Sequence, residues 1–434
     1  MKYIVYVVAL FFLSACSHLD SLAYAEIQDL KEFPQNAVSY TTAIDSNRSL
    51  FEIQSTFKNK YFSSWHMKLP NYSKENFYAP FREFTPHNSF GDNLQPISQE
   101  FLEELEKNTN SQEYSKINLR GITTAQVNLR TLPTDKPFFN DPRKSGEGFP
   151  FDYLQESSIH LNEPILVSHY SLDGAWVYVY TSYASGWIHS NSMALLSDQQ
   201  CQEFENTQKV SITQDDVPLK DDKNQFINFS KIGMQLPLLS ESKDEYIVSV
   251  IVNDMNHNAI YKHVIVPKNI ATTNILTLSQ QNINSMVDAI IHAHYGWGGM
   301  YGERDCSSTL KDLFTPFGIW LPRNSTYQAK IGKIISLQGL NDNDKLERIK
   351  KDGIPFETLL HKKGHILLYA GVYQDKVVVF HNIWGIKTSD GEKSGRIIIG
   401  HTVFSTLEIG KEQKYYASTL LSKLDSMNIL TAKP

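Results

Sequence analysis

The chain has 434 residues, more than the roughly 100 to 200 residues of a typical domain, so we expect about two to four domains. Hydrophobic residues make up 41% of the chain and charged residues 20%, a composition that favours folded globular domains over disorder. The formal net charge of -6 lacks the basic excess with which proteins neutralise nucleic-acid phosphates, so nucleic acid is not an expected partner.

The N-terminus has the pattern of an export signal. Lys2 supplies a positive charge, and residues 4–13 form an apolar run that is long enough for a signal-peptide core but short for a membrane span. The run ends in Leu13-Ser14-Ala15-Cys16, which resembles the lipobox of bacterial lipoproteins. An ordinary secretory signal followed by a chance cysteine is the alternative.

The lipobox resemblance implies where the protein resides. Residues 1–15 would be a lipoprotein signal peptide, and Cys16 would become the lipidated N-terminus that anchors the protein to a bacterial membrane. Ser17 follows the cysteine where many inner-membrane lipoproteins of enteric bacteria carry aspartate. By this analogy we expect an exported protein on the periplasmic face of the outer membrane.

The chain has three cysteines, Cys16, Cys201 and Cys306, so we expect no disulfide framework. Cys201 has no histidine or cationic group beside it in the sequence, and we interpret it as incidental or buried. Cys306 lies in a different setting, which is described below.

The first half of the mature chain is predicted to contain a helical region and a barrel. Residues 16–116 are polar and aromatic, with a helical repeat at 100–105, and predict a mostly helical or irregular region. Residues 117–198 contain short alternating runs, such as 176–180, that predict a small β-barrel. The segment Gly186-Trp187-Ile188 resembles the Gly-Trp strand of bacterial SH3-like barrels, which bind or position cell-wall ligands.

The second half is predicted to contain a further barrel and a mixed domain. Residues 199–272, with strand-like runs at 246–252 and 259–266, predict a second and weaker SH3-like barrel. Apolar residues then recur at helical spacing after Asn282 or Asn284, either of which could cap a helix. We expect a mixed helix and strand domain in residues 273–434.

Cys306 is predicted to begin a helix. It follows Arg304 and Asp305, and it precedes an apolar stripe that ends near Gly318. The unpaired amides and dipole of a helix N-terminus favour negative charge, so we expect the pKa of this thiol to be lowered. The position suits a nucleophile.

A cysteine nucleophile needs a base, and His365 is the candidate. It begins an apolar strand after Gly364, and His381 lies on the next strand, where it could orient the first imidazole. A three-residue turn would pair Tyr373 with Val377 and displace His381 along the strand, so either a bulge is required or Asn382 is the orienting residue.

Residues 282–399 resemble the NlpC family of papain-like cell-wall cysteine peptidases. The resemblance rests on five ordered motifs: Trp297-Gly298-Gly299, Asp305-Cys306-Ser307, Leu321-Pro322-Arg323-Asn324-Ser325 with Gln328, Gly364-His365, and the hairpin that follows. It implies an α+β chain in which a papain-like catalytic domain follows two SH3-like barrels and a helical region. Ser308 and the segment before His365 depart from the usual pattern and put the subtype in doubt.

The resemblance also implies roles for individual residues. Cys306 would be the nucleophile, His365 the base and His381 the polar third member, while Tyr295, Asp305 and Ser307 would meet the substrate. The substrate class it implies is the peptidoglycan stem peptide, cut between γ-linked D-glutamate and the next diamino acid.

In multidomain members of this family a barrel covers one end of the groove, so the resemblance implies that the first barrel restricts cleavage to peptides with a free N-terminal L-Ala. The ammonium group would need a carboxylate, for which Asp305 is the best candidate and Asp152 or Glu156 are weaker ones.

Two other functions remain open from the sequence. The chain could be a non-catalytic wall-binding lipoprotein, or the same Cys-His site could serve an amidase or acyltransferase. We expect no cofactor, and no metal, because His292 and His294 on a helix would not face one ligand.

Overall fold

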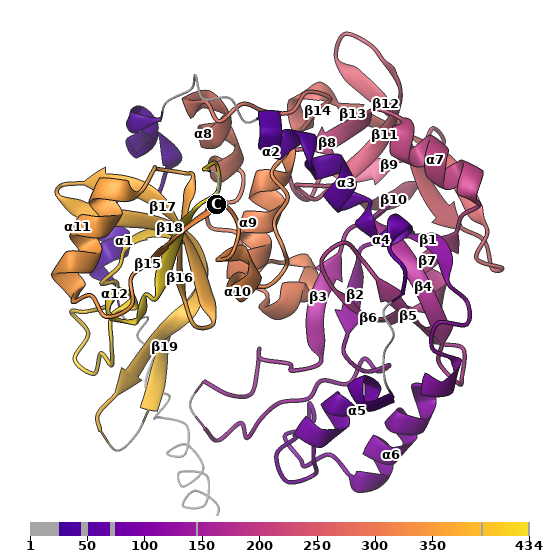
Figure 1. The fold of residues 1–434 in the computed structure, drawn as a ribbon, viewed down its shortest axis with the longest axis horizontal. Helices are drawn as coiled ribbons and strands as arrows, with labels where there is room; N and C mark the ends of the chain where they lie inside the picture. Colours follow the sequence, from indigo (N-terminus) through magenta and orange to yellow (C-terminus); the bar gives the residue numbers. More distant parts are fainter. Residues whose placement is uncertain (1–25, 45–50, 70–73, 145, 392–393, 433–434) are drawn as a thin grey trace, which may run out of the picture.

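The computed structural model describes residues 26–44, 51–69, 74–144, 146–391 and 394–432. It confirms the expected order of a helical region, two SH3-like domains and a mixed helix and strand domain (Figure 1). The signal segment and Cys16 lie outside the described residues, so the lipid anchor stays a prediction. Among the described residues, no helix is both long and apolar enough to cross a membrane.

The N-terminal region is helical, as expected, and runs along the whole molecule. Its first helix lies against the C-terminal sheet, α2 to α4 cross to the barrels, and α5 and α6 lie below the first barrel (Figure 1). The α-helices are α1 (Gln28–Glu32), α2 (Phe51–Ser55), α3 (Phe57–Tyr61), α4 (Ser63–His66), α5 (Lys74–Glu83) and α6 (Gln99–Asn108).

Hydrogen bonds made by buried side chains hold this region against the other domains. Trp65 is buried, and its indole N–H donates to the Gly121 carbonyl of the first barrel at 2.9 Å. Asp29 is buried against the C-terminal sheet, where it accepts from the backbone N–H of Thr406 at 2.6 Å. A buried polar group needs such a partner, so these contacts define where the segment lies.

The first barrel is a seven-stranded antiparallel sheet with strand order β3-β2-β6-β5-β4-β1-β7. Leucine, isoleucine and valine side chains of its strands form its core together with Met193. The strands are β1 (Leu119–Thr123), β2 (Val127–Arg130), β3 (Gln155–Ile159), β4 (Pro164–Tyr170), β5 (Trp176–Tyr180), β6 (Ser185–His189) and β7 (Met193–Leu195).

The second barrel follows helix α7 (Asp198–Asn206), in which Cys201 is buried. Its main sheet has the order β13-β12-β11-β8-β14, and β9 and β10 form a separate pair. The strands are β8 (Lys209–Ile212), β9 (Pro218–Lys220), β10 (Phe226–Phe229), β11 (Gln235–Glu241), β12 (Glu245–Asn253), β13 (Ala259–Pro267) and β14 (Ala271–Thr272).

The C-terminal domain is built on a six-stranded sheet with order β15-β20-β16-β17-β18-β19. Alternate strand residues pack on α8 and α9 on one face and on α11 on the other, which gives the sheet two cores (Figure 1). The strands are β15 (Lys333–Ser336), β16 (Thr358–Lys362), β17 (His365–Tyr373), β18 (Lys376–Ser389), β19 (Ser394–Thr406) and β20 (Ser426–Ile429). The helices are α8 (Gln280–Asp288), α9 (Cys306–Phe314), α10 (Ser325–Gln328), α11 (Asp342–Asp352) and α12 (Leu420–Lys423).

Two local expectations for the start of this domain were wrong. Ser279 caps α8, in place of Asn282 or Asn284, because the serine hydroxyl accepts from the backbone of the third residue of the helix. His292 and His294 lie beyond the end of α8 in irregular chain, so helical spacing does not separate them.

The hairpin between β17 and β18 also differs from the expected register. Its turn has two residues, Gln374 and Asp375, both with positive φ, and Tyr373 pairs with Lys376 instead of Val377. A bulge between Tyr369 and Gly371 then shifts the pairing. A bulge was one of the two solutions that the sequence left open, and it moves His381 toward His365.

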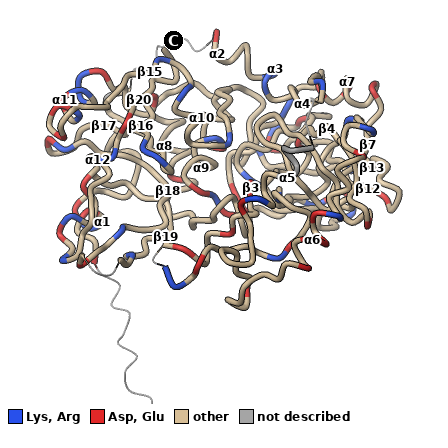
Figure 2. Tube along the Cα trace, turned by 60° about the horizontal axis from the view of Figure 1, so that its bottom comes forward, with Lys and Arg blue, Asp and Glu red and all other residues tan. Residues whose placement is uncertain are grey.

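Charges of both signs are interspersed along the whole trace, and neither sign dominates one domain (Figure 2). This distribution agrees with the composition, which does not favour a nucleic-acid surface.

A loop of the C-terminal domain is pressed against strand β3 of the first barrel. The indole N–H of Trp297 donates to the Asp152 carbonyl at 2.9 Å, and Gln155 donates to the Gly298 carbonyl at 3.1 Å. A Cβ on Gly299 would lie 2.6 Å from the Ser158 Cβ. The residue types of the Trp-Gly-Gly motif therefore suit the close contact with β3 of the first barrel as well as the turn in the loop.

We predict that Gly299→Ala destabilises the protein more than Gly339→Ala. The two glycines have almost the same φ, 81° and 80°, but nothing lies within 4 Å of a Cβ on Gly339. Both variants carry the left-handed backbone cost of about 1 to 2 kcal/mol. Gly299→Ala adds overpacking of about 1 to 3 kcal/mol.

Urea denaturation of the two variants measures this difference. Equal losses in the free energy of unfolding would show that the loop and β3 can separate at no cost, which contradicts the tight contact.

Candidate active site

Cys306 is the first residue of α9, as the sequence predicted. Asp305 is the N-cap, and it forms a capping box in which its carboxylate accepts from the backbone of Ser307 and Ser308. The backbone N–H of Ile366, the second residue of β17, lies close enough to the Cys306 sulfur to lower the pKa of the thiol. The helix and the sheet therefore bring the thiol next to the start of the strand that begins with His365.

The expectation of a lowered thiol pKa was wrong for this structure. Burial, helped by the neighbouring Asp305 carboxylate, raises the pKa of Cys306 to about 12. Burial likewise lowers the pKa of His365 well below its ordinary value, so the resting pair is a neutral thiol and a neutral imidazole. Burial removes water from the thiolate and disfavours that charged form. The attraction of the helix N-terminus for negative charge is weaker than this loss of hydration, so the thiol pKa rises.

His365 and His381 form the start of a hydrogen-bonded chain. Nε2 of His365 lies 2.9 Å from Nδ1 of His381, and Nε2 of His381 lies 2.9 Å from the Ser405 hydroxyl. Ser405 in turn donates to the Thr406 carbonyl at 2.9 Å. All the side chains in this chain are buried.

The direction of this chain determines which nitrogen of His365 is free. A carbonyl only accepts, so the Ser405 hydroxyl must donate to it and accept from Nε2–H of His381. Nδ1 of His381 then carries no proton and accepts from Nε2–H of His365. Nδ1 of His365 is left with a lone pair, which is the form that a general base requires.

Asn382 does not take part in this chain. Its amide donates to the Arg304 carbonyl at 2.9 Å and braces the segment before Cys306. The geometry therefore favours His381 over Asn382 as the third member. Burial, helped by the nearby charge of Lys362, lowers the pKa of His381 to about 3, so this imidazole stays neutral in the relay.

Arg323 is the partner of Asp305. It contacts one carboxylate oxygen at 3.0 Å and the other at 2.6 Å, and it also donates to the hydroxyls of Ser307 and Ser157 at 2.9 Å. Burial alone would raise the pKa of Asp305, but the Arg323 guanidinium lowers it below its ordinary value. Asp305 and Ser307 are thus engaged within the protein, and the structure disfavours Asp305 as the partner of a substrate ammonium.

The two acidic candidates of the first barrel, Asp152 and Glu156, differ in whether a protein group already pairs with the carboxylate. Asp152 is buried and paired with Arg130 at 2.5 Å, so it is not available to a ligand. Glu156 is exposed on β3, and the described residues provide no hydrogen bond or ion pair to its carboxylate. Loss of nearby solvent raises the pKa of Glu156 more than Arg323 lowers it. Glu156 is thus a carboxylate without a partner among the described residues, close enough to Arg323 and Asp305 to interact with their charges.

Tyr295 lies close enough to Cys306 for the two groups to interact electrostatically. Its backbone bridges to Arg304, and its ring lies 5.9 Å from the Trp384 ring. Burial raises the pKa of Tyr295 well above its ordinary value, and the nearby Cys306 raises it further. The hydroxyl therefore keeps its proton and can donate a hydrogen bond.

A second buried charge network holds α9 from behind. Arg304 donates to Asp312 on the helix at 2.6 Å and to Asp215 of the second barrel at 3.0 Å. His160 of the first barrel contacts the same Asp312 at 3.0 Å. Both barrels therefore meet the helix that carries Cys306.

Comparisons with known proteins agree with this architecture. Residues 292–387 match the model of the NlpC/P60 family, and residues 3–114 match the model of its N-terminal stabilising domain. The C-terminal domain is an NlpC/P60 catalytic domain. Residues 137–189 match an SH3 domain of the SH3b1 type and residues 197–243 one of the SH3b2 type. NlpC/P60 proteins are generally cysteine peptidases.

Two solved structures extend the comparison. An NlpC/P60 endopeptidase from Photobacterium damselae subsp. piscicida is 26% identical, with a TM-score of 0.80, and the match covers 92% of this chain and 98% of that one. An NlpC/P60 family protein from Bacillus cereus ATCC 10987 is 15% identical, with a TM-score of 0.46 and coverage of 72% and 99%. A comparison with curated proteins found no match.

Three residues of this NlpC/P60 site had no role assigned from the sequence or only a minor one. Arg323 lies in the Leu-Pro-Arg motif of the sequence, and this motif indicated that Arg323 belongs to the site. Glu156 ranked below Asp305 because the Arg323 pair was unknown. Ser405 had no signal, since it lies 24 residues beyond His381. Within the described residues, no three metal-ligating side chains gather in one place.

We predict that Ser405→Ala slows alkylation of Cys306 by iodoacetamide by roughly 10- to 100-fold. Without the hydroxyl, His381 can carry its proton on Nδ1, which forces the proton of His365 onto the nitrogen needed as the base. The rate of modification, followed by mass spectrometry, measures this directly.

Ser64→Ala is the matched control. Ser64 is also fully buried, and its hydroxyl also donates to a carbonyl, that of Pro164 at 3.0 Å, but in another domain. If the two variants react equally fast with iodoacetamide, Ser405 is a structural residue with no influence on the relay.

Proposed function

We propose that this protein is a cysteine endopeptidase that hydrolyses peptidoglycan stem peptides between γ-D-glutamate and the following diamino acid. The observation that carries the proposal is the buried Cys306 thiol at the start of α9, beside a histidine whose proton position is set by His381 and Ser405. The NlpC/P60 match and the SH3b domains support a cell-wall substrate.

The residues support a two-step acyl transfer. As the Cys306 sulfur attacks the γ-carbonyl carbon, its proton passes to Nδ1 of His365, and a tetrahedral oxyanion forms. The backbone N–H of Cys306 and the Tyr295 hydroxyl are the donors proposed for that oxyanion. The C–N bond then breaks, and His365 returns the proton to the departing amine.

Hydrolysis completes the cycle. Water attacks the thioester carbon, passes a proton to His365, and releases the γ-carboxylate as the thiol recovers its proton. The neutral resting pair means that the thiolate forms only during the attack. An amine in place of this water would make the same site an acyltransferase, which is the alternative chemistry.

We also propose that the first barrel selects peptides with a free N-terminal amine. Glu156 on β3 is a carboxylate without a partner among the described residues, and it lies near Arg323 and Asp305 beside the nucleophile. An ammonium is the complementary group. A stem peptide that is still attached to its sugar has no such group.

The central experiment incubates the protein with L-Ala-γ-D-Glu-diaminopimelate and identifies the products by mass spectrometry. We expect L-Ala-D-Glu and free diaminopimelate from the wild type and no turnover from Cys306→Ala, which loses the nucleophile but keeps the fold. Turnover by Cys306→Ala would overturn the site. An amine adduct of the acyl part would identify an acyltransferase, and an inactive wild type would favour a wall-binding role.

The amine preference has its own test. Glu156→Gln should lower kcat/KM for the free tripeptide by about 10-fold, because a charge-assisted contact to the ammonium is lost. The N-acetylated tripeptide should be a poor substrate of both proteins. Glu100→Gln, an exposed carboxylate on α6, is the control. Equal kcat/KM on free and acetylated peptides would refute selection at the N-terminus.

Anchoring through Cys16 is a separate proposal, supported by the lipobox pattern of the sequence. Cys16→Ser should move the protein from the membrane fraction to the soluble fraction of bacterial cells and leave its specific activity unchanged, because the lipid serves as an anchor. Fractionation followed by immunoblotting measures this, and unchanged membrane partition would indicate another anchor.

A further inference from the structure

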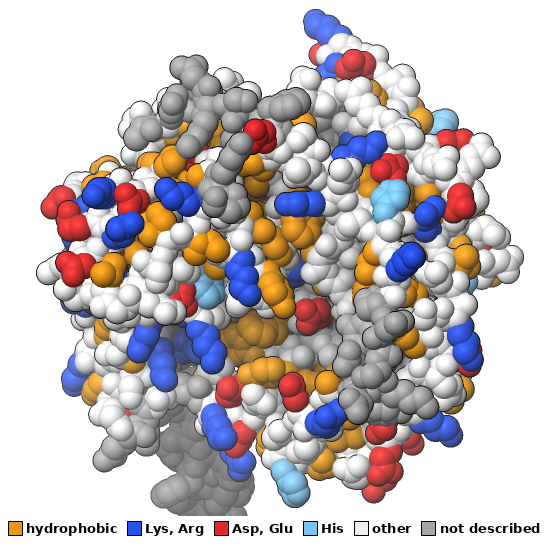
Figure 3. Space-filling model, viewed as in Figure 1, with side chains coloured by type: hydrophobic (Ala, Val, Ile, Leu, Met, Phe, Trp, Pro, Cys, Tyr) orange, Lys and Arg blue, Asp and Glu red, His pale blue; other side chains and the backbone are white. Residues whose placement is uncertain are grey.

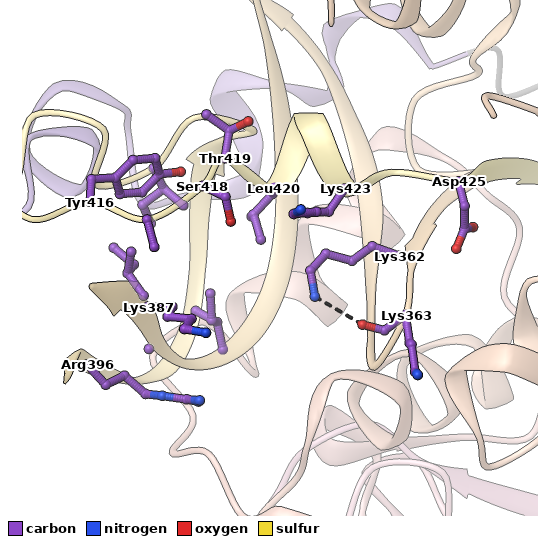
Figure 4. A pocket seen from close by; sticks show the side chains of 15 residues that line it. Lys362, Lys363, Lys387, Arg396, Tyr416, Ser418, Thr419, Leu420, Lys423 and Asp425 are labelled. Carbon is purple, nitrogen blue, oxygen red and sulfur yellow. Dashed lines mark hydrogen bonds between the residues drawn. The ribbon is translucent and has the colours of Figure 1, made fainter. Parts of the chain in front are cut away.

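A cavity of about 300 Å³ lies where the N-terminal region, the second barrel and the C-terminal domain meet. Hydrophobic side chains are exposed between the C-terminal domain and the barrels (Figure 3). The cavity shares no lining residue with a larger basic cavity, in which Lys362 and Arg396 lie on opposite sides (Figure 4). Lys362 pairs with His365 between β16 and β17, so the basic cavity belongs to the site already described. The smaller cavity is independent of that site.

The floor of the smaller cavity is the outer face of the second barrel's main sheet. Lys209 and Ser211 are two residues apart on β8, so their side chains point to the same side of the strand, while their neighbours in sequence belong to the barrel core. Gln235 on β11 and Thr272 on β14 pair with Ser211 from either side and continue this face. The floor of the cavity is therefore polar.

The walls of this cavity are largely apolar and come from other parts of the chain. Phe57 and Tyr61 of α3 contribute from the N-terminal region, and Ile275 and Pro316 contribute from the C-terminal domain. Ligand pockets span about 300 to 1,000 Å³ and combine apolar walls with a few polar groups that fix the ligand. A cavity of this size and lining therefore suits a small ligand with an apolar body and a polar end.

Lys209 brings a cation without a counter-ion into the cavity. Its Nζ donates to the carbonyls of Phe204 and Thr207, the latter at 2.6 Å, and the described residues form no ion pair with it. Nζ also lies 5.3 Å from the centroid of the Phe62 ring. An ammonium has three protons, and two are used by the carbonyls, so one proton is available to a ligand.

Ser211 adds a second donor beside Lys209. Its hydroxyl accepts from the side-chain amide of Gln235 at 2.7 Å, and its own proton has no acceptor among the described residues. Glu205, the one carboxylate in the lining, is already paired with His66 at 2.8 Å. A cation and a hydroxyl donor on the same side of one strand are complementary to a carboxylate.

We propose that this cavity binds a small carboxylate with an apolar body. Lys209 and Ser211 hold the carboxylate, and the side chains of α3 and Pro316 enclose the body. The site is separate from the proposed peptidase chemistry, and it does not depend on it. Pro316 lies shortly after the end of α9, so a bound ligand contacts the N-terminal region, the second barrel and the helix that begins with Cys306 together.

The test measures binding of octanoate to the protein by isothermal titration calorimetry, with octan-1-ol as the uncharged analogue. We expect octanoate to bind at least about 10-fold more tightly than octanol, because a charge-assisted hydrogen bond to Lys209 adds to burial of a similar apolar body. Lys209→Met should weaken octanoate by about 10-fold or more, whereas Lys209→Arg should retain more of the affinity. Octanol that binds as tightly as octanoate would refute the carboxylate contact.

Lys345→Met is the matched control for loss of a buried lysine. Nζ of Lys345 also donates to two backbone carbonyls, those of Leu421 at 3.2 Å and Ser422 at 3.0 Å, but Lys345 lies on α11, outside the cavity. This variant should bind octanoate as the wild type does. If Lys209→Met and Lys345→Met bind octanoate equally well, Lys209 serves only to cap the end of α7, and the proposal fails.

The pH dependence of the wild type gives a second measurement, which does not depend on how a variant folds. Burial lowers the pKa of Lys209 to about 7, helped by the nearby Lys58 and opposed by Glu205. The carboxylate needs the ammonium form, which is lost as the pH rises through this value, so octanoate should bind about 10-fold more weakly at about pH 8 than at about pH 6. His66, the partner of Glu205, is the neighbouring group that could also respond to pH, and His66→Gln should keep this dependence. Equal affinity at both pH values, or no binding of octanoate at either, would overturn the proposal.

Discussion

The ion pair between Asp305 and Arg323 is the constraint on which the site depends. It is buried, it joins the N-cap of α9 to the Leu-Pro-Arg loop, and through Ser157 it reaches the first barrel. Loss of one partner would leave a buried charge uncompensated, at a cost of about 3 to 5 kcal/mol. Because Arg323 satisfies Asp305, the helix can present Cys306 at its first position, and Glu156 remains a carboxylate without a partner among the described residues.

The hydrogen-bonded chain of His365, His381 and Ser405 constrains the site from the sheet side of Cys306. A neutral, buried imidazole has two inequivalent nitrogens, and the Ser405 hydroxyl determines which nitrogen of His381, and in turn of His365, carries the proton. The N-terminal region contributes as well, because Asp29 binds the backbone of Thr406, whose carbonyl ends the relay. A segment near the proposed lipid anchor therefore supports the edge strand on which the relay terminates.

The sequence determined what depends on neighbouring residues. The order of the domains, the strands of both barrels and the helix that begins at Cys306 follow from patterns within a few residues, because caps, apolar periodicity and turn residues act locally. Cys306, His365 and His381 were candidates because of their positions at a helix start and on two successive strands, the resemblance to a family agreed with this choice, and the structure places their elements together.

The tertiary structure decided whatever depends on burial or on distant segments. The raised pKa of Cys306 follows from loss of solvent, which no local pattern reports, and it reversed the expectation from the helix dipole. The bulge that moves His381 toward His365 depends on packing of the whole sheet. The sequence favoured Asp305 as a substrate ligand. In the structure its carboxylate is paired with Arg323, which lies 18 residues away in the chain. Charge pairing in a folded protein is set by proximity in space, and the sequence alone shows proximity along the chain.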